Sequence, residues 1–474
     1  MLTTTGTRIL HGRDVIYTDE PFITDANVVD QMNLAVTAYQ GNSGDIDYLY
    51  RYYKGEQPIL WKDVESRPEI NNKIVENRAN EIVSFKTGYL MGEPVQYVAH
   101  CEADKVAEEI NLLNEYMFEE DKASKDKEIA DWMHICGTSY RLVLPNAVRS
   151  EDVAPFRIYT LDPRNTLVVY SSDIEHRPVM GITYTNPVIG APRYCVYTEN
   201  RYYEITENQI VVNRPHIMGR IPIIEYPANM ARLGAFEIVI GLLDALNDTA
   251  SKRQDGLDKF VDALLLFHNV NIDKNEYDEF MSRGAIKFQD IDAQTKAEIK
   301  YIVNELNQGQ TETLVQHQYQ TVLEICGMPV MGNGTSDSSN NGAIILRNGW
   351  SNADARAKDT ELMFKKSEKK FLEIVLDICR TRQRDFNLRL GNVEIRFTRR
   401  NYENILAKSQ VLTTMLQQPK IHPLLAFEHS GMFSDPGVAY EMSKEYYAEQ
   451  GQEQDVQEVP ANENQDSAGD STSL

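Results

Sequence analysis

The stretch GAFEIVIGLLDALNDTASKRQDGLDKFVDALLLF, residues 234–267, has the pattern of one long amphipathic helix. Asp and Lys occupy one face, and the apolar residues recur on the other at helical spacing: Phe236, Val239, Ile240, Leu243, Leu246, Leu257, Val261, Leu264 and Leu265. At 1.5 Å per residue such a helix is about 50 Å long. A helix of that length with few breaks is typical of a strut or of a stem between subunits.

The residues after this helix predict a small mixed insert and then a second helix. Within residues 268–307, AIKFQDI (285–291) has a strand pattern and AEIKYIVNELN (297–307) has a helix pattern. Residues 308–326 have the pattern of the second helix, and the GMP sequence that follows is a stop signal.

A polar stretch, VMGNGTSDSSNNGA, separates the second helix from the next one. Its residues 332–342 contain no apolar anchor, which predicts a mobile loop. These are the candidate functional residues: Gly332, Asn333, Gly334, Thr335, Ser336, Asp337, Ser338, Ser339, Asn340, Asn341 and Gly342. A further long helix is predicted directly afterwards, from Ala343 to about Asp385.

The residues before the long helix predict helices followed by a sheet. Helical patterns occupy residues 28–39 and 47–53, with a GNSGD turn between them, and then 69–89 and 102–134. From residue 139 to about 225, short runs rich in β-branched and aromatic residues, such as SYRLVL and TLVVY, alternate with turn clusters. The alternation predicts an antiparallel meander packed on helices, so the expected fold class is α+β. We interpret the abundant Tyr as sheet packing.

The C-terminal part predicts a returning strand, several helices and a tail. VEIRFT (393–398) has a strand pattern, residues 402–417 have a helix pattern, and two more helical pieces lead to residue 448. Residues 449–474 contain seven acidic residues and no Lys or Arg, which predicts a disordered acidic tail.

The charge of the chain limits the possible functions. Lys and Arg number 48 against 71 Asp and Glu, a net charge of −23, which argues against binding nucleic acid by neutralising its phosphates. Residues 347–400 depart from this with 14 basic and 8 acidic residues. Two interpretations stay open for this stretch: its lysines contact DNA, or they form the polar face of a helix. The lysines are Lys365, Lys366, Lys369 and Lys370. The expected core face of the helix consists of Leu362, Phe364, Phe371 and Val375.

The sequence lacks the usual signatures of catalysis. It contains no G-x-x-x-x-G-K-[ST] phosphate loop, no G-x-S-x-G, no H-E-x-x-H and no C-x-x-C. Because nine His and five Cys are scattered, we expect no catalytic residue, no metal site and no cofactor, and we interpret the thiols as buried and free. The N-terminus lacks the apolar core of a signal peptide, and no apolar run approaches the ~20 residues that cross a bilayer.

The order of these parts resembles the portal protein family of tailed double-stranded-DNA bacteriophages, in the branch found in phages of Gram-positive hosts. Five local stretches carry the likeness: RYYKGEQPI (51–59), KIVENRANEIVSFKTGYLMGEPVQY (73–97), GTSYRLVL followed by LDPRNTLVVY, GRIPIIEYPAN followed by the long helix, and TRRNYENILAKSQVLTTML (398–416). The likeness spans about residues 30–448.

The resemblance implies a dodecameric ring of identical subunits at one capsid vertex, with double-stranded DNA passing through its tunnel during packaging and ejection. The implied partners are the terminase large subunit, the head–tail adaptor protein, and the major capsid and scaffolding proteins. The implied location is the virion, after assembly in the host cytoplasm. The parts carried over are an N-terminal arm (1–29), a wing (30–233), stem helices (234–267 and 308–329), a clip (268–307), a tunnel loop (330–342), a long kinked helix with the returning wing strand (343–401), a helical crown (402–448) and the tail (449–474).

The loop departs from the simplest picture of this family because it contains no Lys or Arg. We therefore expect steric and hydrogen-bond contact with DNA there. A packaging ATPase is a competing hypothesis, which the missing phosphate loop disfavours. A non-ring scaffold or adaptor of head assembly is the alternative that stays open.

Overall fold

The structure of the chain is a computed structural model. It describes residues 10, 12–64, 68–100, 104–148, 153–261, 264–268, 298–302, 308–330, 349–383, 385–398, 405–433 and 436–455. The chain divides into two compact units, one of residues 1–336 with 346–399 and the other of residues 337–345 with 400–474. The first combines helices and sheets, which confirms the α+β class.

Helix α1 (Val28–Tyr53) is a single helix that runs through the GNSGD sequence. The predicted break there is wrong, because the glycines face open space and the two residues between them contact the rest of the fold. The amide of Asn42 bonds both backbone groups of Asp14, at 2.9 and 2.8 Å, and the Ser43 hydroxyl donates to the carbonyl of Arg164 at 2.8 Å. These contacts outweigh the weak helix propensity of the stretch.

Helix α2 spans only Arg78–Leu90, so the prediction of a helix from residue 69 is wrong for its first part. Residues 71–77 run instead as an irregular segment against helix α5 (Ile240–Val261). Three backbone N–H groups of this segment donate to α5 side chains: Asn72 to Asp255 at 2.7 Å, Ile74 to Ser251 at 2.9 Å and Glu76 to Asn247 at 3.0 Å. Two residues of extended chain span about 6.6 Å, and four residues of helix span about 6.0 Å. The spacing of the N–H donors along the segment therefore matches the spacing of the acceptor side chains along α5.

The predicted helix 102–134 is two helices, α3 (Asp104–Glu119) and α4 (Lys122–Cys136). Between them Asp121 has a φ of 49°, which ends the first helix. Helix α4 ends at Gly137, where a φ of 82° and the carbonyl of Arg232, 2.0 Å from the place of a Cβ, both demand glycine.

The strands of residues 138–227 form two sheets, which confirms the predicted meander. The six-stranded sheet has the order β1 (Ile16–Thr18), β5 (Thr166–Ser171), β6 (Pro178–Thr185), β7 (Arg193–Tyr197), β8 (Arg201–Thr206) and β9 (Gln209–Pro215). The three-stranded sheet has the order β10 (Ile223–Pro227), β3 (Thr138–Pro145) and β4 (Phe156–Leu161). Strand β1 pairs in parallel with β5, so the predicted N-terminal arm contributes to the sheet.

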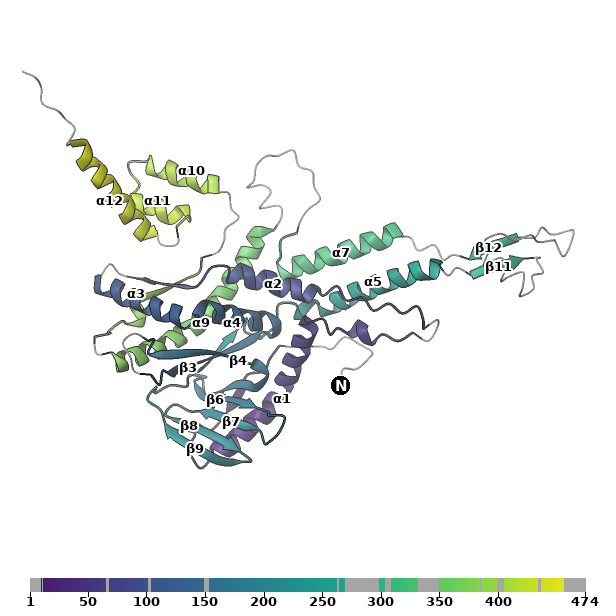
Figure 1. Cartoon of the computed structure of the whole chain (residues 1–474), viewed down its shortest axis with the longest axis horizontal. Coiled ribbons are helices and arrows are strands. Elements are labelled where there is room, and N and C mark those ends of the chain that lie inside the picture. Colours follow the sequence, from purple (N-terminus) through teal and green to yellow (C-terminus); the bar gives the residue numbers. More distant parts are fainter. Residues whose placement is uncertain are drawn as a thin grey trace, which may run out of the picture. The chain divides into compact units, whose positions relative to one another are not determined.

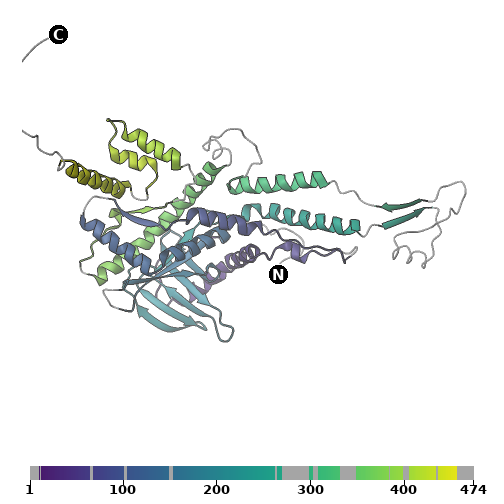
Figure 2. The same cartoon turned by 45° about the horizontal axis from the view of Figure 1, so that its top comes forward.

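Helix α5 and helix α7 (Gln308–Cys326) lie side by side in Figure 1 and Figure 2. The helix predicted to reach residue 267 ends at Val261, and Leu264–His268 forms strand β11 instead. Strand β12 (Glu298–Ile302) pairs with it antiparallel, so the helix predicted at 297–307 is wrong there. The alternation in EIKYI is the strand signal that the helix interpretation overlooked. The strand predicted at 285–291 lies outside the described residues.

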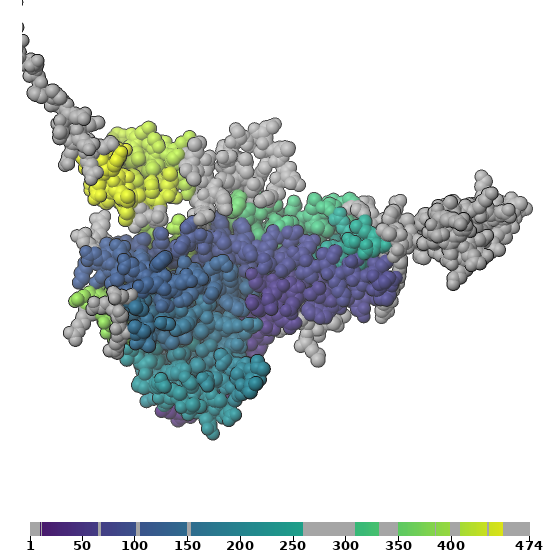
Figure 3. All heavy atoms as spheres, viewed as in Figure 1, coloured from purple at the N-terminus to yellow at the C-terminus, as the bar shows by residue number. Residues whose placement is uncertain are grey.

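Helix α9 (Trp350–Arg382) is followed by strand β13 (Val393–Arg396), which pairs with β2 (Gln96–Ala99). The returning strand is therefore confirmed. Short 3₁₀ turns occur at Pro58–Trp61, Pro163–Asn165, Glu237–Val239 and Leu390–Asn392. One core lies among α1, α5, α7 and the six-stranded sheet, and a second joins α3, α4 and α9 to the three-stranded sheet. In Figure 3 the residues coloured purple and blue form a continuous surface beside the teal residues.

The second unit contains the helices α10 (Ile405–Leu416), α11 (Pro423–Ser430) and α12 (Pro436–Asp455). Helix α12 continues past residue 448, so the predicted start of the tail is wrong; residues 456–474 lie outside the described part. Nowhere in the described ranges is a helix both long and apolar enough to cross a membrane.

Candidate functional site

The predicted site, residues 332–342, lies outside the described residues, so what the structure provides is the frame that holds it. Helix α7 ends in a turn at Gly327, whose φ is 66°, and the N–H of Met328 donates to the carbonyl of Leu323 at 2.8 Å. The chain returns at Gly349, where a Cβ would lie 3.8 Å from the carbonyl oxygen of Met328. Met328 and Gly349, described residues before and after the segment 331–348, therefore lie close together, and we call this place the loop base.

Aromatic side chains fix the start of α9 at the loop base. The ring of Trp350 lies 6.1 Å from that of Phe85 and 6.0 Å from that of Tyr89, both on α2. Phe85 and Tyr89 themselves stack at 5.8 Å with an interplanar angle of 8°. Such ring pairs add about 0.5–1.5 kcal/mol beyond the burial of their area. The start of α9 is thus attached to α2.

A buried ion cluster of Lys122, Asp126, Arg141 and Glu368 holds the middle of α9. Glu368 is 0% exposed and pairs with Lys122 at 2.9 Å and with Arg141 at 3.2 Å. Asp126 pairs with the same two cations, at 2.5 Å with Lys122. Two positive and two negative groups therefore neutralise one another across α4, β3 and α9.

Two tyrosines complete the cluster. The hydroxyls of Tyr97 and Tyr226 donate to the Glu368 carboxylate at 2.5 and 2.7 Å. Burial raises the pKa of Glu368, but Lys122 and Arg141 outweigh it, so the pKa falls to about 2. The carboxylate is therefore charged at neutral pH, and rotation or sliding of α9 requires breaking its bonds.

The cluster was not predicted from the sequence, although the sequence contains a signal for it. Phe364, Glu368, Phe371 and Val375 follow one another at three- and four-residue spacing, so the acid lies within an apolar seam. Arg141 is the one charged residue of the strand SYRLVL. A charge in the middle of an apolar pattern indicates a buried charge that needs a partner, but it does not show which residue that partner is.

The structure tests the helix interpretation of the basic stretch, residues 347–400, in part. Phe364, Phe371 and Val375 are fully buried as predicted, but Leu362 is 66% exposed, so its place on the core face is wrong. Lys365 pairs with Glu361 at 2.6 Å. Contact of these lysines with DNA stays a prediction.

Polar contacts tie α5, α7 and α2 together below the loop base. Arg253 of α5 pairs with Glu312 of α7 at 2.6 Å. The guanidinium of Arg78 lies 4.2 Å from the ring centroid of Tyr319, whose hydroxyl donates to Glu81 at 2.6 Å. The two long helices are therefore cross-linked to each other and to the body.

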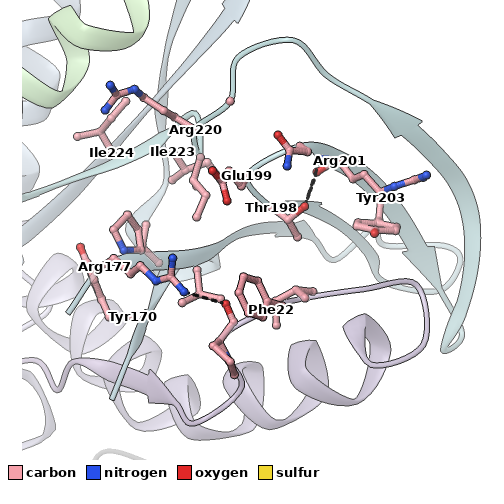
Figure 4. A pocket seen from close by; sticks show the side chains of 18 of the residues that line it. Phe22, Tyr170, Arg177, Thr198, Glu199, Arg201, Tyr203, Arg220, Ile223 and Ile224 are labelled. Atoms are coloured by element: carbon pink, nitrogen blue, oxygen red, sulfur yellow. Dashed lines mark hydrogen bonds between the residues drawn. The ribbon is translucent and has the colours of Figure 1, made fainter. Parts of the chain in front are cut away.

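A cleft of about 1020 Å³ opens elsewhere in the first unit, between residues 21–26, the two sheets and α9 (Figure 4). Its apolar side chains include Val168, Val179, Ile221, Ile223 and Ile374.

Two arginines of the cleft have partners in the chain. Arg220 pairs with Glu373 at 2.5 Å, and Arg177 lies 5.6 Å from the centroid of the Phe22 ring and donates to the carbonyl of Pro21 at 3.4 Å.

In the described part of the chain, no group of three His, Cys, Asp or Glu side chains is placed so that it could hold a metal ion. Burial raises the pKa of Cys136 and of Cys379 to about 12, so both thiols are protonated at neutral pH.

Comparison with known proteins identifies the family. The search of curated proteins gave no match. Among solved structures, the neck of an empty GTA particle, computed with C6 symmetry, is similar with a TM-score of 0.43 and 11% identity, over 75% of this chain and 90% of that chain. Residues 38–456 match the family described as "Phage portal protein, SPP1 Gp6-like". Because that match covers most of the sequence, the chain belongs to the phage portal protein family.

Proposed function

We propose that the chain forms a closed homo-oligomeric ring, a dodecamer, at one vertex of a phage capsid, and that double-stranded DNA is packaged and ejected through it. The observation that carries this proposal is the family match over residues 38–456. In this role the protein is a structural part of the virion and catalyses no reaction. The proposed partners are the terminase large subunit, the head–tail adaptor, and the major capsid and scaffolding proteins.

The parts of the chain receive roles in this proposal. Helices α5 and α7 form the stem, and the β11–β12 hairpin belongs to the clip that meets the motor and the adaptor. The helices and sheets of the first unit form the wing, and α10, α11 and α12 form the crown. The cross-links between α5, α7 and α2 support a stem that transmits force without bending.

Residues 332–342 are proposed as the narrowest part of the tunnel. Their support is chemical: the segment is polar and lacks Lys and Arg. DNA has helical symmetry and the ring does not, so identical loops cannot all meet the duplex equally. Gly332, Gly334 and Gly342 allow each loop its own conformation at little steric cost.

The charge of the body supports a conduit. With a net charge of −23, the chain lacks the basic surface that would retain DNA by releasing counterions. A duplex can therefore move past it without being held. Strong binding would stall translocation.

The ring is tested by light scattering on purified protein. The expected mass is that of a dodecamer of the 54.2 kDa chain, or of a ring one subunit larger. A monomer at every salt and protein concentration would refute the ring and favour a non-ring scaffold or adaptor. ATP hydrolysis by the pure protein would revive the motor hypothesis.

The loop is tested separately with Gly332→Pro, Gly334→Pro and Gly342→Pro in one chain. Rings should form normally, while heads that carry the variant should fill poorly with DNA. Normal filling by such rings would exclude the gate role and leave the ring proposal intact.

A further inference from the structure

A small cavity at the loop base collects basic groups from three helices. Its volume is about 20 Å³, room for one water-sized group. Its lining comes from α2, α4, α9 and the turn after α7: Phe85, Lys86, Tyr89, Leu90, His134, Gly327, Ala353, Arg356, Ala357 and Thr360. We call it the basic cavity.

Glycine and alanine create this space and direct Arg356 across it. A Cβ at Gly327 would lie 2.8 Å from Cγ of Arg356, so only glycine lets the stem of that side chain cross the turn. Ala353 is buried and lies one helical turn before Arg356, and the Arg356 carbonyl accepts the Thr360 hydroxyl at 3.2 Å.

The two cations line the same cavity, and neither has a carboxylate partner among the described residues. Among the acids of the same helices, Glu81 binds Arg78, Asp131 binds Lys127 and Asp354 binds Lys358. Asp359, three residues after Arg356, is exposed. Burial lowers the pKa of Lys86, and the charge of Arg356 lowers it further.

The third basic residue, His134, is neutral. Burial, and then the charge of Lys86, lowers its pKa to about 3. Its Nδ1 lies 3.1 Å from the hydroxyl oxygen of Thr87. The histidine therefore adds polarity to the wall and no negative charge.

We propose that the basic cavity binds a small inorganic anion, chloride or one oxygen of phosphate, between Lys86 and Arg356. An anion there replaces repulsion between two like charges by two charge-assisted contacts, one to the partly buried Lys86 and one to the exposed Arg356. Because Lys86 belongs to α2 and Arg356 to the second turn of α9, the bound anion fastens the start of α9 to α2. The inference is independent of the proposed function.

The size of the cavity favours a free anion over a phosphate of duplex DNA. Phe85, Tyr89 and Leu90 wall it, and it holds one water-sized group. A phosphate in a duplex carries its neighbouring sugars and cannot enter so small a space. Free phosphate can place one oxygen in the cavity with its other oxygens outside.

The test is thermal unfolding of the full chain in rising sodium phosphate or sodium chloride, with ionic strength held constant by sodium isethionate. The wild-type melting temperature should rise by a few degrees and saturate. In Lys86→Gln and Arg356→Gln the saturable rise should disappear. Lys366→Gln, which removes an exposed positive charge from the same helix, should respond like the wild type.

Isothermal titration calorimetry with phosphate gives the second readout. We expect one site per subunit and an affinity at least ten times weaker in either cavity variant. Arg356→Lys, which keeps the charge, should bind better than Arg356→Gln. An equal thermal response in wild type and both Gln variants would overturn the proposal.

Two further results would also overturn it. The first is a result of fluorescence anisotropy: the Gln variants bind a labelled DNA duplex more weakly than the wild type but keep their response to phosphate. That result would show that the cavity contacts DNA. The second is a result of light scattering: the mass of the ring changes in the variants whether or not phosphate is present. That result would show that the cavity binds a carboxylate of a second copy of the chain.

Discussion

Replacing Glu368 by Gln tests whether the buried ion cluster holds α9 in place. The substitution keeps the size of the side chain and removes one negative charge from a group that is 0% exposed. Lys122 and Arg141 then share the single carboxylate of Asp126. An uncompensated buried charge is costly, about 3–5 kcal/mol when one partner of a buried pair is removed.

The pKa of Glu368 leads to the same magnitude. It falls from 4.5 to about 2, and each unit corresponds to 1.36 kcal/mol, so the charged form stabilises the fold by about 3 kcal/mol. Because the pKa is lower in the folded chain than in the unfolded one, this contribution is present above about pH 4.5 and is lost as the pH falls towards 2. The difference between wild type and variant should shrink over the same interval.

The assay is urea unfolding followed by circular dichroism at pH 7 and at stepwise lower pH. Asp354→Asn is the matched control, because Asp354 pairs with Lys358 at 2.8 Å on the exposed face of the same helix and should cost less than about 1 kcal/mol. The double variant Arg141→Met with Glu368→Met removes one charge of each sign and should be more stable than Glu368→Met alone. The reasoning is refuted if Glu368→Gln costs no more than the control at pH 7.

Three further predictions concern stability and reactivity. Gly41→Ala, in mid-helix with open space around it, should raise the free energy of unfolding by about 0.5–1 kcal/mol, whereas Gly137→Ala should lower it by more than that, as urea unfolding would measure. The thiols of Cys136 and Cys379, with pKa raised to about 12 by burial, should react with iodoacetamide only after denaturation; rapid labelling of the native chain would contradict this. Deleting residues 456–474, which are polar and acidic, should leave the melting temperature nearly unchanged, and a fall of many degrees would show that they dock on the body.

Helices and strands with a clear hydrophobic pattern in their own sequence were predicted well. The β-branched runs of residues 139–225 predicted the meander, and the apolar faces of α5, α7 and α9 predicted long helices. The buried residues Phe364, Phe371 and Val375 follow directly from helical spacing. Local periodicity determines these features because each element must bury its own apolar face.

Elements that depend on distant partners were missed. The sequence GNSGD reads as a turn, yet it is helical because Asn42 and Ser43 bond residues far along the chain. The helix predicted from residue 69 gives way to an irregular segment because α5 offers side-chain acceptors at matching spacing. The helix predicted to reach residue 267 ends early because β12 pairs with residues 264–268.

The sequence alone therefore determined the α+β class, the order of the parts and the absence of familiar catalytic motifs, because these depend on composition and local periodicity. Tertiary structure decided which charges meet. Arg141 and Glu368 are 227 residues apart and Lys86 and Arg356 lie on different helices, so no pattern along the chain shows that the first two attract and the second two repel. Electrostatic energy depends on distance and burial in space, and only the packing of α2, α4, β3 and α9 sets both.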